Sequence, residues 1–242
     1  MKRTLTITTF LFLASAAMLA QLPVAPAAQP QAKASAGSLE SVLVSMDRAA
    51  ATFQTAQADF VWDQFSKVVN DHDLQKGTIY YRRAGHGVEM SAIITSPTQK
   101  YVLFKEGKVE VYQPGIEQVT EYSAGKNRAD FESFLVLGFG GRGHDLPKSF
   151  DVRYDGTENV DGVQAAKLTL TPKQAKVRNM FQTILLWIDP ARGISVQQQF
   201  IDPDGNYRLA KYSNIKMNQK LADDVFKLKT TGKTKVVRPQ SQ

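Results

Sequence analysis

The chain has 242 residues, 43% of them hydrophobic and 22% charged, a composition typical of a folded globular protein. The absence of cysteine from the sequence excludes disulfide bonds, a thiolate nucleophile, cysteine-based metal sites and a lipid-modified N-terminal cysteine. The formal net charge of +7 is mildly basic, and three of the basic residues lie in the first 36 positions. Basic and acidic residues are mixed along the rest of the chain, so we expect no nucleic-acid-binding surface.

The first 28 residues have the pattern of a secretory signal peptide. Lys2 and Arg3 precede an apolar run from Leu5 to Ala20, which is followed by small residues. Several positions offer the small residues that a signal peptidase reads, and we expect cleavage somewhere in 16–28. A retained membrane anchor is the competing interpretation, but the run is short for a bilayer span and is interrupted by threonines. The pattern therefore predicts an exported protein.

A tether and a single folded domain are expected after this segment. Residues 29–37 are rich in Ala, Pro and Gln and offer nothing large to bury, which predicts a disordered tether. The folded domain, 38–242, begins with Ser38 as a candidate helix N-cap. Apolar residues then recur at spacings of three and four and predict an amphipathic helix with one apolar face: Leu39, Val42, Leu43, Met46, Ala49, Ala50 and Phe53.

Beyond residue 57 the apolar pattern changes to a period of two, which predicts strands joined by short turns. The strands are expected at about 57–69, 75–83, 87–95, 100–105, 108–113, 117–122, 150–155, 163–171, 182–189, 194–201, 206–217 and 226–229. Glu106-Gly107 and residues 203–206 are typical of tight hairpin turns. Two helices, at 127–137 and 172–180, interrupt the succession. Successive strands with few helices indicate a mainly β protein of the α+β type, whose antiparallel sheet curls or closes.

Three segments resemble sites for chemistry, and each has a simpler structural interpretation. Asp71-His72-Asp73 resembles a metal or acid–base cluster, but we expect it to form a polar turn between strands. The glycine-rich segment 138–143 lacks the residues that end a phosphate-binding loop, and we expect a flexible exit from the preceding helix. Residues 202–206 begin like a calcium loop but lack its distal carboxylate, and a hairpin explains them. We therefore expect no catalytic residue, no metal site and no cofactor.

Four local patterns follow one another along the chain in an order shared with one known family. They are Met46-Asp47-Arg48 with Ala58-Asp59-Phe60, the hairpin Glu106-Gly107-Lys108 to Tyr112-Gln113-Pro114 with Glu117-Gln118-Val119, Ile188-Asp189-Pro190 with Gln197-Gln198-Gln199-Phe200 and Tyr212-Ser213-Asn214-Ile215, and residues 223–229 with Gly232 and Val236-Val237. Through these patterns the sequence resembles the LolA-type periplasmic carriers of outer-membrane lipoproteins. Together they span nearly all of 38–237.

The resemblance implies both a fold and a function. The implied fold is an incomplete, strongly curved antiparallel β-barrel, with a lid of short α-helices over its concave apolar face. The implied function is that of a monomeric periplasmic carrier, not an enzyme, which accepts acylated lipoproteins from an inner-membrane lipoprotein-releasing transporter and delivers them to an outer-membrane acceptor. An apolar cavity suits this role because acyl chains cannot cross an aqueous compartment while they are exposed to water. The alternative is that the same scaffold carries or senses another hydrophobic ligand, a phospholipid or a glycolipid.

The resemblance also implies site residues. Arg83 matches an arginine that hydrogen-bonds the lid backbone in the family's closed state, and its planar five-donor head suits that role. A solvated strand-end arginine is the alternative, and Ala84 replaces the proline that follows this arginine in the family. For the hydrophobic cavity and lid we expect Leu43, Met46, Phe53, Phe60, Trp62, Phe131, Phe134 and Leu135. The alternative is that these apolar stripes form an ordinary core.

Overall fold

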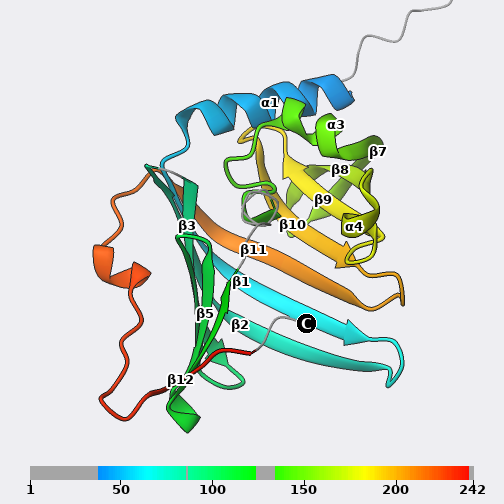
Figure 1. The fold of residues 1–242 in the computed structure, drawn as a ribbon. Helices are drawn as coiled ribbons and strands as arrows, with labels where there is room; N and C mark the ends of the chain where they lie inside the picture. Colours follow the sequence, from blue (N-terminus) through cyan, green and yellow to red (C-terminus); the bar gives the residue numbers. More distant parts are fainter. Residues whose placement is uncertain (1–37, 86, 124–133, 240–242) are drawn as a thin grey trace, which may run out of the picture. The chain divides into compact units, whose positions relative to one another are not determined.

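The computed structural model describes residues 38–85, 87–123 and 134–239, which belong to one compact unit (Figure 1). The predicted signal peptide and tether lie outside these ranges, and so does Phe131 of the predicted lid. Within the described ranges, no helix is long and apolar enough to span a membrane.

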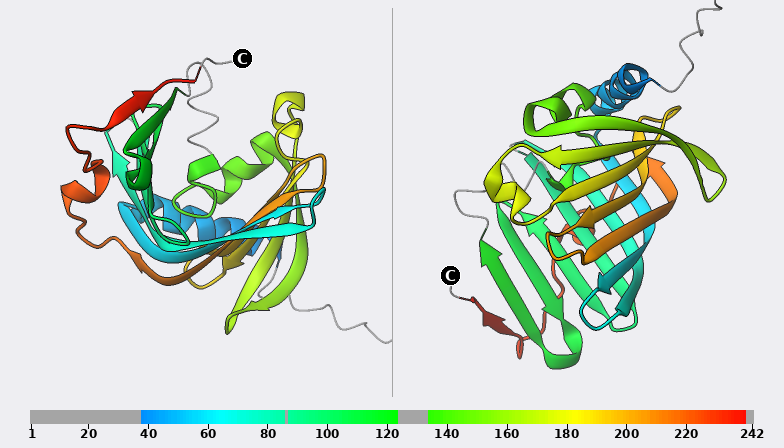
Figure 2. Two further views of the ribbon diagram at one scale, coloured as in Figure 1. Left: turned by 90° about the horizontal axis from the view of Figure 1, so that it is seen from below. Right: turned by 90° about the vertical axis from the view of Figure 1, so that its right-hand side faces the viewer.

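A single sheet of twelve strands forms most of the described structure. The strands are β1 (Thr55–Ser66), β2 (Asp71–Ala84), β3 (Gly87–Ser96), β4 (Lys100–Lys105), β5 (Lys108–Gln113), β6 (Gln118–Ser123), β7 (Phe150–Val160), β8 (Val163–Pro172), β9 (Thr183–Asp189), β10 (Ile194–Ile201), β11 (Tyr207–Met217) and β12 (Lys235–Val237). Their order in the sheet is β12-β6-β5-β4-β3-β2-β1-β11-β10-β9-β8-β7, and only the β12–β6 pair is parallel. The sheet curls strongly, but its edge strands β12 and β7 do not pair (Figure 2). The predicted incomplete, curved barrel is therefore confirmed.

Helix α1 (Leu39–Thr52) lies across one end of the curled sheet (Figure 1). It begins where predicted, because the Ser38 hydroxyl accepts a hydrogen bond from the Ser41 backbone N–H at 3.2 Å and so caps the first turn. The buried side chains of the helix recur at helical spacing and include Val42, Leu43, Met46 and Ala50. The periodicity of the sequence thus becomes one apolar face that packs on the sheet.

A second segment, residues 134–149, packs inside the curve of the sheet, and we call it the covering segment (Figure 2). It has a helical stretch at 134–135, a series of turns at 136–140, and then the short helices η3 (Gly143–Asp145) and α3 (Leu146–Ser149). Residues 127–133 of the predicted second helix lie outside the described ranges. The remaining short helices are η1 (Pro114–Ile116), α4 (Ala175–Arg178) and η4 (Asp223–Phe226).

Two predictions of local secondary structure are wrong. Asp71-His72-Asp73 does not form a turn but opens strand β2, and the turn lies at 67–70, where Asn70 has a φ of 50°. The His72 ring nitrogen Nδ1 lies 2.8 Å from a carboxylate oxygen of Asp63 on the neighbouring strand β1. Pairing with β1 therefore extends β2 through a polar segment that turn propensity alone assigned to a loop.

The predicted strand at 226–229 is also absent from the described structure. Its place is taken by η4, in which Phe226 is 1% exposed and lies under the Arg82 guanidinium, 4.2 Å from the ring centroid. The last strand is instead β12, which pairs in parallel with β6. The burial of Phe226 therefore holds the backbone in η4, and strand pairing begins only at Lys235.

Buried apolar residues form two clusters on the concave face and one on the outer face. The first concave cluster joins Phe53, at the C-terminus of α1, to β1–β4 and β11, and the second joins α1 and the covering segment to β7–β9. The outer cluster contains Val160, Ala165, Trp187 and Val196. Ala166 and Ala165 belong to different clusters because successive side chains of a strand point to opposite faces.

Candidate functional site

The seven described residues that we predicted for a cavity and lid all lie on the concave side, but in two clusters. Phe53, Phe60, Trp62 and Leu135 belong to the first cluster, and Leu43, Met46 and Phe134 belong to the second. Four of them, Leu43, Met46, Phe53 and Phe60, are at most 4% exposed. The rings of Phe60 and Trp62 stack at a centroid distance of 4.1 Å. The structure thus brings the predicted residues to the interior, where they pack against other side chains.

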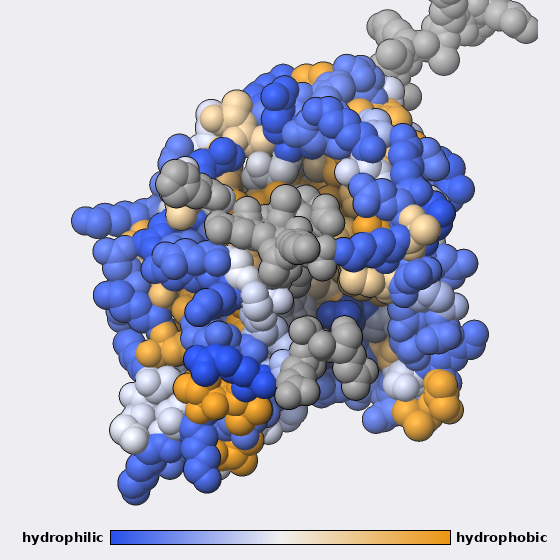
Figure 3. All heavy atoms as spheres, viewed as in Figure 1, coloured by the Kyte–Doolittle hydropathy of each residue, from blue (hydrophilic) through white to orange (hydrophobic). Residues whose placement is uncertain are grey.

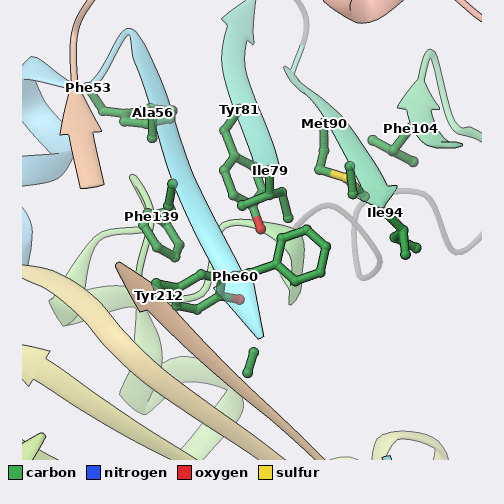
Figure 4. Packing of buried hydrophobic residues seen from close by; sticks show 13 residues of the cluster. Phe53, Ala56, Phe60, Ile79, Tyr81, Met90, Ile94, Phe104, Phe139 and Tyr212 are labelled. Carbon is green, nitrogen blue, oxygen red and sulfur yellow. The ribbon is translucent and has the colours of Figure 1, made fainter. Parts of the chain in front are cut away.

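An aromatic residue of the covering segment, Phe139, fills the centre of the first cluster. Its ring is fully buried and lies 5.3 Å from the ring of Tyr81 in β2 and 4.9 Å from that of Tyr212 in β11 (Figure 4). Burial raises the pKa of both tyrosines, so their hydroxyls are neutral. We predicted none of these three residues, Phe139, Tyr81 and Tyr212, as part of the site. Phe139 in particular lies in a glycine-rich stretch that has no apolar periodicity.

Two hollows are found among the described residues, and the second has in its lining Phe181, whose ring lies 5.8 Å from that of Phe134. One, of about 670 Å³, is on the outer side and has Val160, Val163, Val196 and Ile215 in its lining. The other, of about 370 Å³, lies near the β1–β2 and β10–β11 turns and includes Phe65, Phe181 and Phe200. None of the seven described residues that we predicted for the cavity lines either hollow. Among the described residues, Phe139, Leu137 and Leu146 of the covering segment pack into the two concave clusters.

Arg83 connects β2 to the C-terminus of α1. Its Nε donates a hydrogen bond to the carbonyl of Phe53 at 3.1 Å, and Nη2 donates to the carbonyl of Ala50 at 3.2 Å. Both carbonyls belong to the last turn of the helix, where intrahelical partners are missing and the helix dipole is negative. The guanidinium also lies 5.7 Å from the centre of the Phe53 ring. The resemblance predicted a contact with lid backbone, and the structure places Arg83 on the carbonyls of α1.

A buried glutamine, Gln198 of β10, holds the covering segment. Its side-chain amide nitrogen donates to the carbonyl of Leu137, while its oxygen accepts from the Tyr212 hydroxyl at 3.3 Å. The backbone N–H of Ser195 donates to the carbonyl of Gly138 at 2.8 Å. Gln198 is only 5% exposed. A signal for it exists in the sequence, because it occupies the same face of a predicted strand as Phe200, and a glutamine at an inward position requires a partner.

The glycine-rich segment is packed, and our prediction of a flexible exit is wrong. Gly140 has a φ of +95°, and a Cβ added to it would lie 2.5 Å from Cδ1 of Phe53. Gly138 has a φ of +78° and lies against Ser195. The two glycines let the backbone of the covering segment approach α1 and β10 more closely than any larger residue allows.

The covering segment also carries a histidine that contacts α1. His144 Nδ1 lies 2.6 Å from a carboxylate oxygen of Asp47, and Nε2 lies 3.3 Å from Glu40. The hydrogen bond to Asp47 and, next, the one to Glu40 raise the pKa of His144. Burial raises the pKa of Asp47, but the hydrogen bonds and charge of His144 outweigh burial, so the pKa of Asp47 is lowered. The ion pair therefore joins the covering segment to the helix.

The interior is suited to binding apolar groups. In the described residues, no group of three or more histidines and carboxylates is placed to hold a metal ion. No buried side-chain polar atom of these residues is left without a hydrogen-bond partner. Some of the described polar side chains inside bind backbone, as Gln198 and Ser45 do, and others bind side chains, as Tyr212 does. The described interior is therefore held together mainly by burial of apolar surface.

Comparisons with known proteins agree with this architecture. A family described as "Outer membrane lipoprotein carrier protein LolA" matches residues 51–229. No curated protein matches the sequence significantly. An uncharacterized conserved protein from Thermus thermophilus has a similar structure, with a TM-score of 0.52 and 14% identity over 83% of this chain and 98% of that chain.

Two further solved structures are less similar. The lipoprotein LppX of Mycobacterium tuberculosis has a TM-score of 0.46 and 12% identity over 76% of this chain and 99% of that chain. A LolA superfamily protein from Nitrosomonas europaea has a TM-score of 0.38 and 16% identity over 78% of this chain and 97% of that chain. At these identities, structural likeness bears on the fold alone.

Proposed function

Because the chain belongs to the LolA family of outer membrane lipoprotein carrier proteins, we propose that it is a periplasmic carrier of acylated lipoproteins. The acyl chains bind between the concave face of the sheet and the segments that cover it. The carrier accepts its cargo from an inner-membrane releasing transporter and delivers it to an outer-membrane acceptor. Its role is binding and release, and it catalyses no reaction.

The observation that carries this proposal is the filling of the interior by a residue of the covering segment. Phe139 packs against the rings of Tyr81 and Tyr212 and belongs to the same buried cluster as Phe53. The segment that bears it is joined to the sheet by few polar contacts, among them those of Gln198 and the Ser195 N–H. An apolar cargo can therefore replace an apolar side chain without leaving the cluster exposed to water.

The contacts of the empty state oppose the burial of an acyl chain. An acyl chain of about 16 carbons gains on the order of 12 kcal/mol on burial, at about 0.8 kcal/mol per methylene, before the costs of binding. Opening the interior loses the packing of Phe139. It also breaks the hydrogen bonds of Arg83 and Gln198, and each hydrogen bond contributes about 0.5–1.5 kcal/mol net. A carrier needs this opposition, because cargo that gained the full burial energy would not be released.

Native mass spectrometry of the protein isolated gently from the periplasm tests the proposal. The mass of each complex is measured, and the apolar species is extracted and identified. A protein preparation stripped of ligand and then mixed with a photoactivatable acyl probe is the control, since it shows whether the interior can be loaded at all.

We expect a co-purifying acylated polypeptide. A free phospholipid or glycolipid as the sole ligand would replace lipoprotein carriage with lipid carriage. A protein that is empty and also fails to take up the acyl probe would mean that the apolar clusters are an ordinary core. Failure to recover the protein from the periplasm would contradict the proposed location independently of the ligand.

A further inference from the structure

Exposed apolar side chains of the described residues are concentrated at one end of the sheet. Ten large hydrophobic residues are exposed, and six of them belong to two places at this end: Val68, Val69 and Leu74 at the β1–β2 turn, and Ile116, Val236 and Val237 along η1 and β12. Val68 and Val69 are 89% and 68% exposed. Figure 3 shows apolar residues at two separate places along the lower side of the molecule.

The topology explains why these places lie at the same end. Strands β1, β3 and β5 end where β2, β4 and β6 begin, because neighbouring strands are antiparallel. Strand β12 runs parallel to β6, so Lys235 lies beside Gln118 at that end. The end faces away from α1, as both Figure 1 and the right-hand view of Figure 2 show. We call it the turn end.

Each pair of exposed valines follows a lysine. Lys67 precedes Val68 and Val69, and Lys235 precedes Val236 and Val237. From residue 225 to residue 242 the sequence contains five basic residues and no acidic one. The turn end therefore combines protruding apolar side chains with a basic C-terminal segment.

The basic residues of this segment differ in their pairing. Arg238 lies 3.2 Å from Glu121, and Lys229 lies 3.0 Å from Asp224. Lys233 and Lys235 are exposed and form no ion pair among the described residues. Their positive charge thus remains available to a partner.

We propose that the turn end docks onto an anionic lipid surface, with Val68 and Val69 entering the headgroup layer and Lys233 and Lys235 contacting anionic headgroups. Amphipathic surfaces of this kind bind through buried apolar area together with electrostatic attraction to anionic lipids. The acidic residues Asp71 and Asp73, which follow the β1–β2 turn, and Asp202 and Asp204 in the β10–β11 turn limit the basic contact to the side of β12.

The spacing of the two apolar places favours a lipid surface over a protein partner. Six strand spacings separate β1 from β12, which is about 29 Å along the curved sheet at about 4.8 Å per strand. A lipid surface can meet both places at once. The opposite edge strand, β7, contrasts with β12, since it carries the charged residues Asp151, Arg153, Asp155 and Glu158 that discourage such contacts.

Sedimentation with vesicles tests the docking surface. The full exported protein is mixed with vesicles of phosphatidylcholine alone, or of equal parts phosphatidylcholine and phosphatidylglycerol, at low and high salt. One test variant combines Lys233→Glu with Lys235→Glu, and its matched control combines Arg48→Glu with Lys216→Glu, two exposed basic residues away from the turn end. A second test variant combines Val68→Ser with Val69→Ser.

The control for the second variant combines Val44→Ser with Val61→Ser, two exposed valines that lie elsewhere. All these positions are exposed, so we expect every variant to fold, which circular dichroism checks. Since all proteins share the same N-terminus, differences between test and control report on the turn end alone.

We expect the wild type to sediment with the anionic vesicles and to be released by high salt. The lysine variant should bind at least about 25-fold more weakly, at about fivefold for each lysine that is replaced, and the serine variant should also bind more weakly. Equal binding by test and control variants would overturn the proposal. So would a wild-type protein that does not sediment with the anionic vesicles. Formation of a dimer that requires the same residues, measured by ultracentrifugation, would instead assign the surface to a second copy of the chain.

Discussion

Arg82 and Arg83 are consecutive residues of β2, yet their guanidinium groups bind on opposite faces of the sheet. Arg83 donates to the carbonyls of Ala50 and Phe53 at the end of α1. Arg82 pairs with the buried Glu89 and with Asp223, and it covers the ring of Phe226. Because side chains alternate along a strand, Arg83 binds helix α1 on the concave side and Arg82 binds the C-terminal segment on the outer side.

Replacing Arg83 tests the proposed latch. The change Arg83→Leu removes two hydrogen bonds to the closed state, so closing the empty interior no longer competes as well with cargo. We expect cargo to be retained and its transfer to an acceptor to slow about tenfold, the effect of roughly 1–2 kcal/mol. Transfer of a labelled lipoprotein to acceptor-containing vesicles is the measurement.

Arg82→Leu is the matched control for the latch, because it removes the same charge from the adjacent position. It should loosen the C-terminal segment and leave transfer unchanged. Normal transfer by the Arg83→Leu protein would show that Arg83 is only a strand-end residue.

Removing the ring of Phe139 should enlarge the interior. We expect Phe139→Ala to lower the free energy of unfolding by about 3–5 kcal/mol, as for other buried aromatic residues, and to increase uptake of a photoactivatable acyl probe. Phe226→Ala removes an equally buried ring on the outer side and should lower stability without increasing uptake. Equal uptake by both variants would mean that Phe139 does not occupy the ligand's place.

Gln198 is expected to control opening of the covering segment. The change Gln198→Leu leaves the Leu137 carbonyl without its donor, at a cost of about 1–3 kcal/mol for a buried unsatisfied group. Hydrogen exchange of residues 134–149 should become faster, while that of β1 and β2 should change little. Gln197→Leu, at the partly exposed neighbouring position, is the control and should leave the exchange of this segment as it is.

The contact between His144 and α1 should make stability depend on pH. The pKa of His144 is raised in the folded protein, so its contribution is fully present below the unfolded pKa of about 6.5 and is lost as the pH rises through the folded pKa. The pKa of Asp47 is lowered, so this carboxylate stays ionised throughout that range. We expect the free energy of unfolding of the wild type, relative to His144→Gln, to fall as the pH rises above about 6.5. Parallel curves for the two proteins would refute this assignment.

The sequence predicts elements whose signals are local and misses those that depend on distant partners. Helix α1 and the strands through β11 follow from apolar periodicity and turn residues, which lie within a few positions of each element. Strand β12 escaped prediction because three residues acquire strand structure only by pairing with β6, more than 100 positions earlier. Phe226 was placed in a strand for the same reason, since its burial under Arg82 is a tertiary contact.

The candidate site divides in the same way. The apolar stripe of α1 and the inward positions of β1 could be recognised from spacing alone. Phe139 could not, because its burial results from the close approach of Gly138 and Gly140 to residues in other elements. Arg83 was identified only through the family resemblance, as strand-end arginines are common on solvent-exposed surfaces.

The unpaired edges β12 and β7 have a consequence for the range of cargo sizes. In a closed barrel the interior width is set by strand number and stagger, and it cannot change unless a ladder of hydrogen bonds breaks. This sheet can instead flatten or tighten through small changes in twist spread over many strand pairs, with every ladder intact. If the proposed function holds, we expect such an interior to adapt its width, so that one chain accommodates guests that differ in the number or length of their hydrocarbon tails.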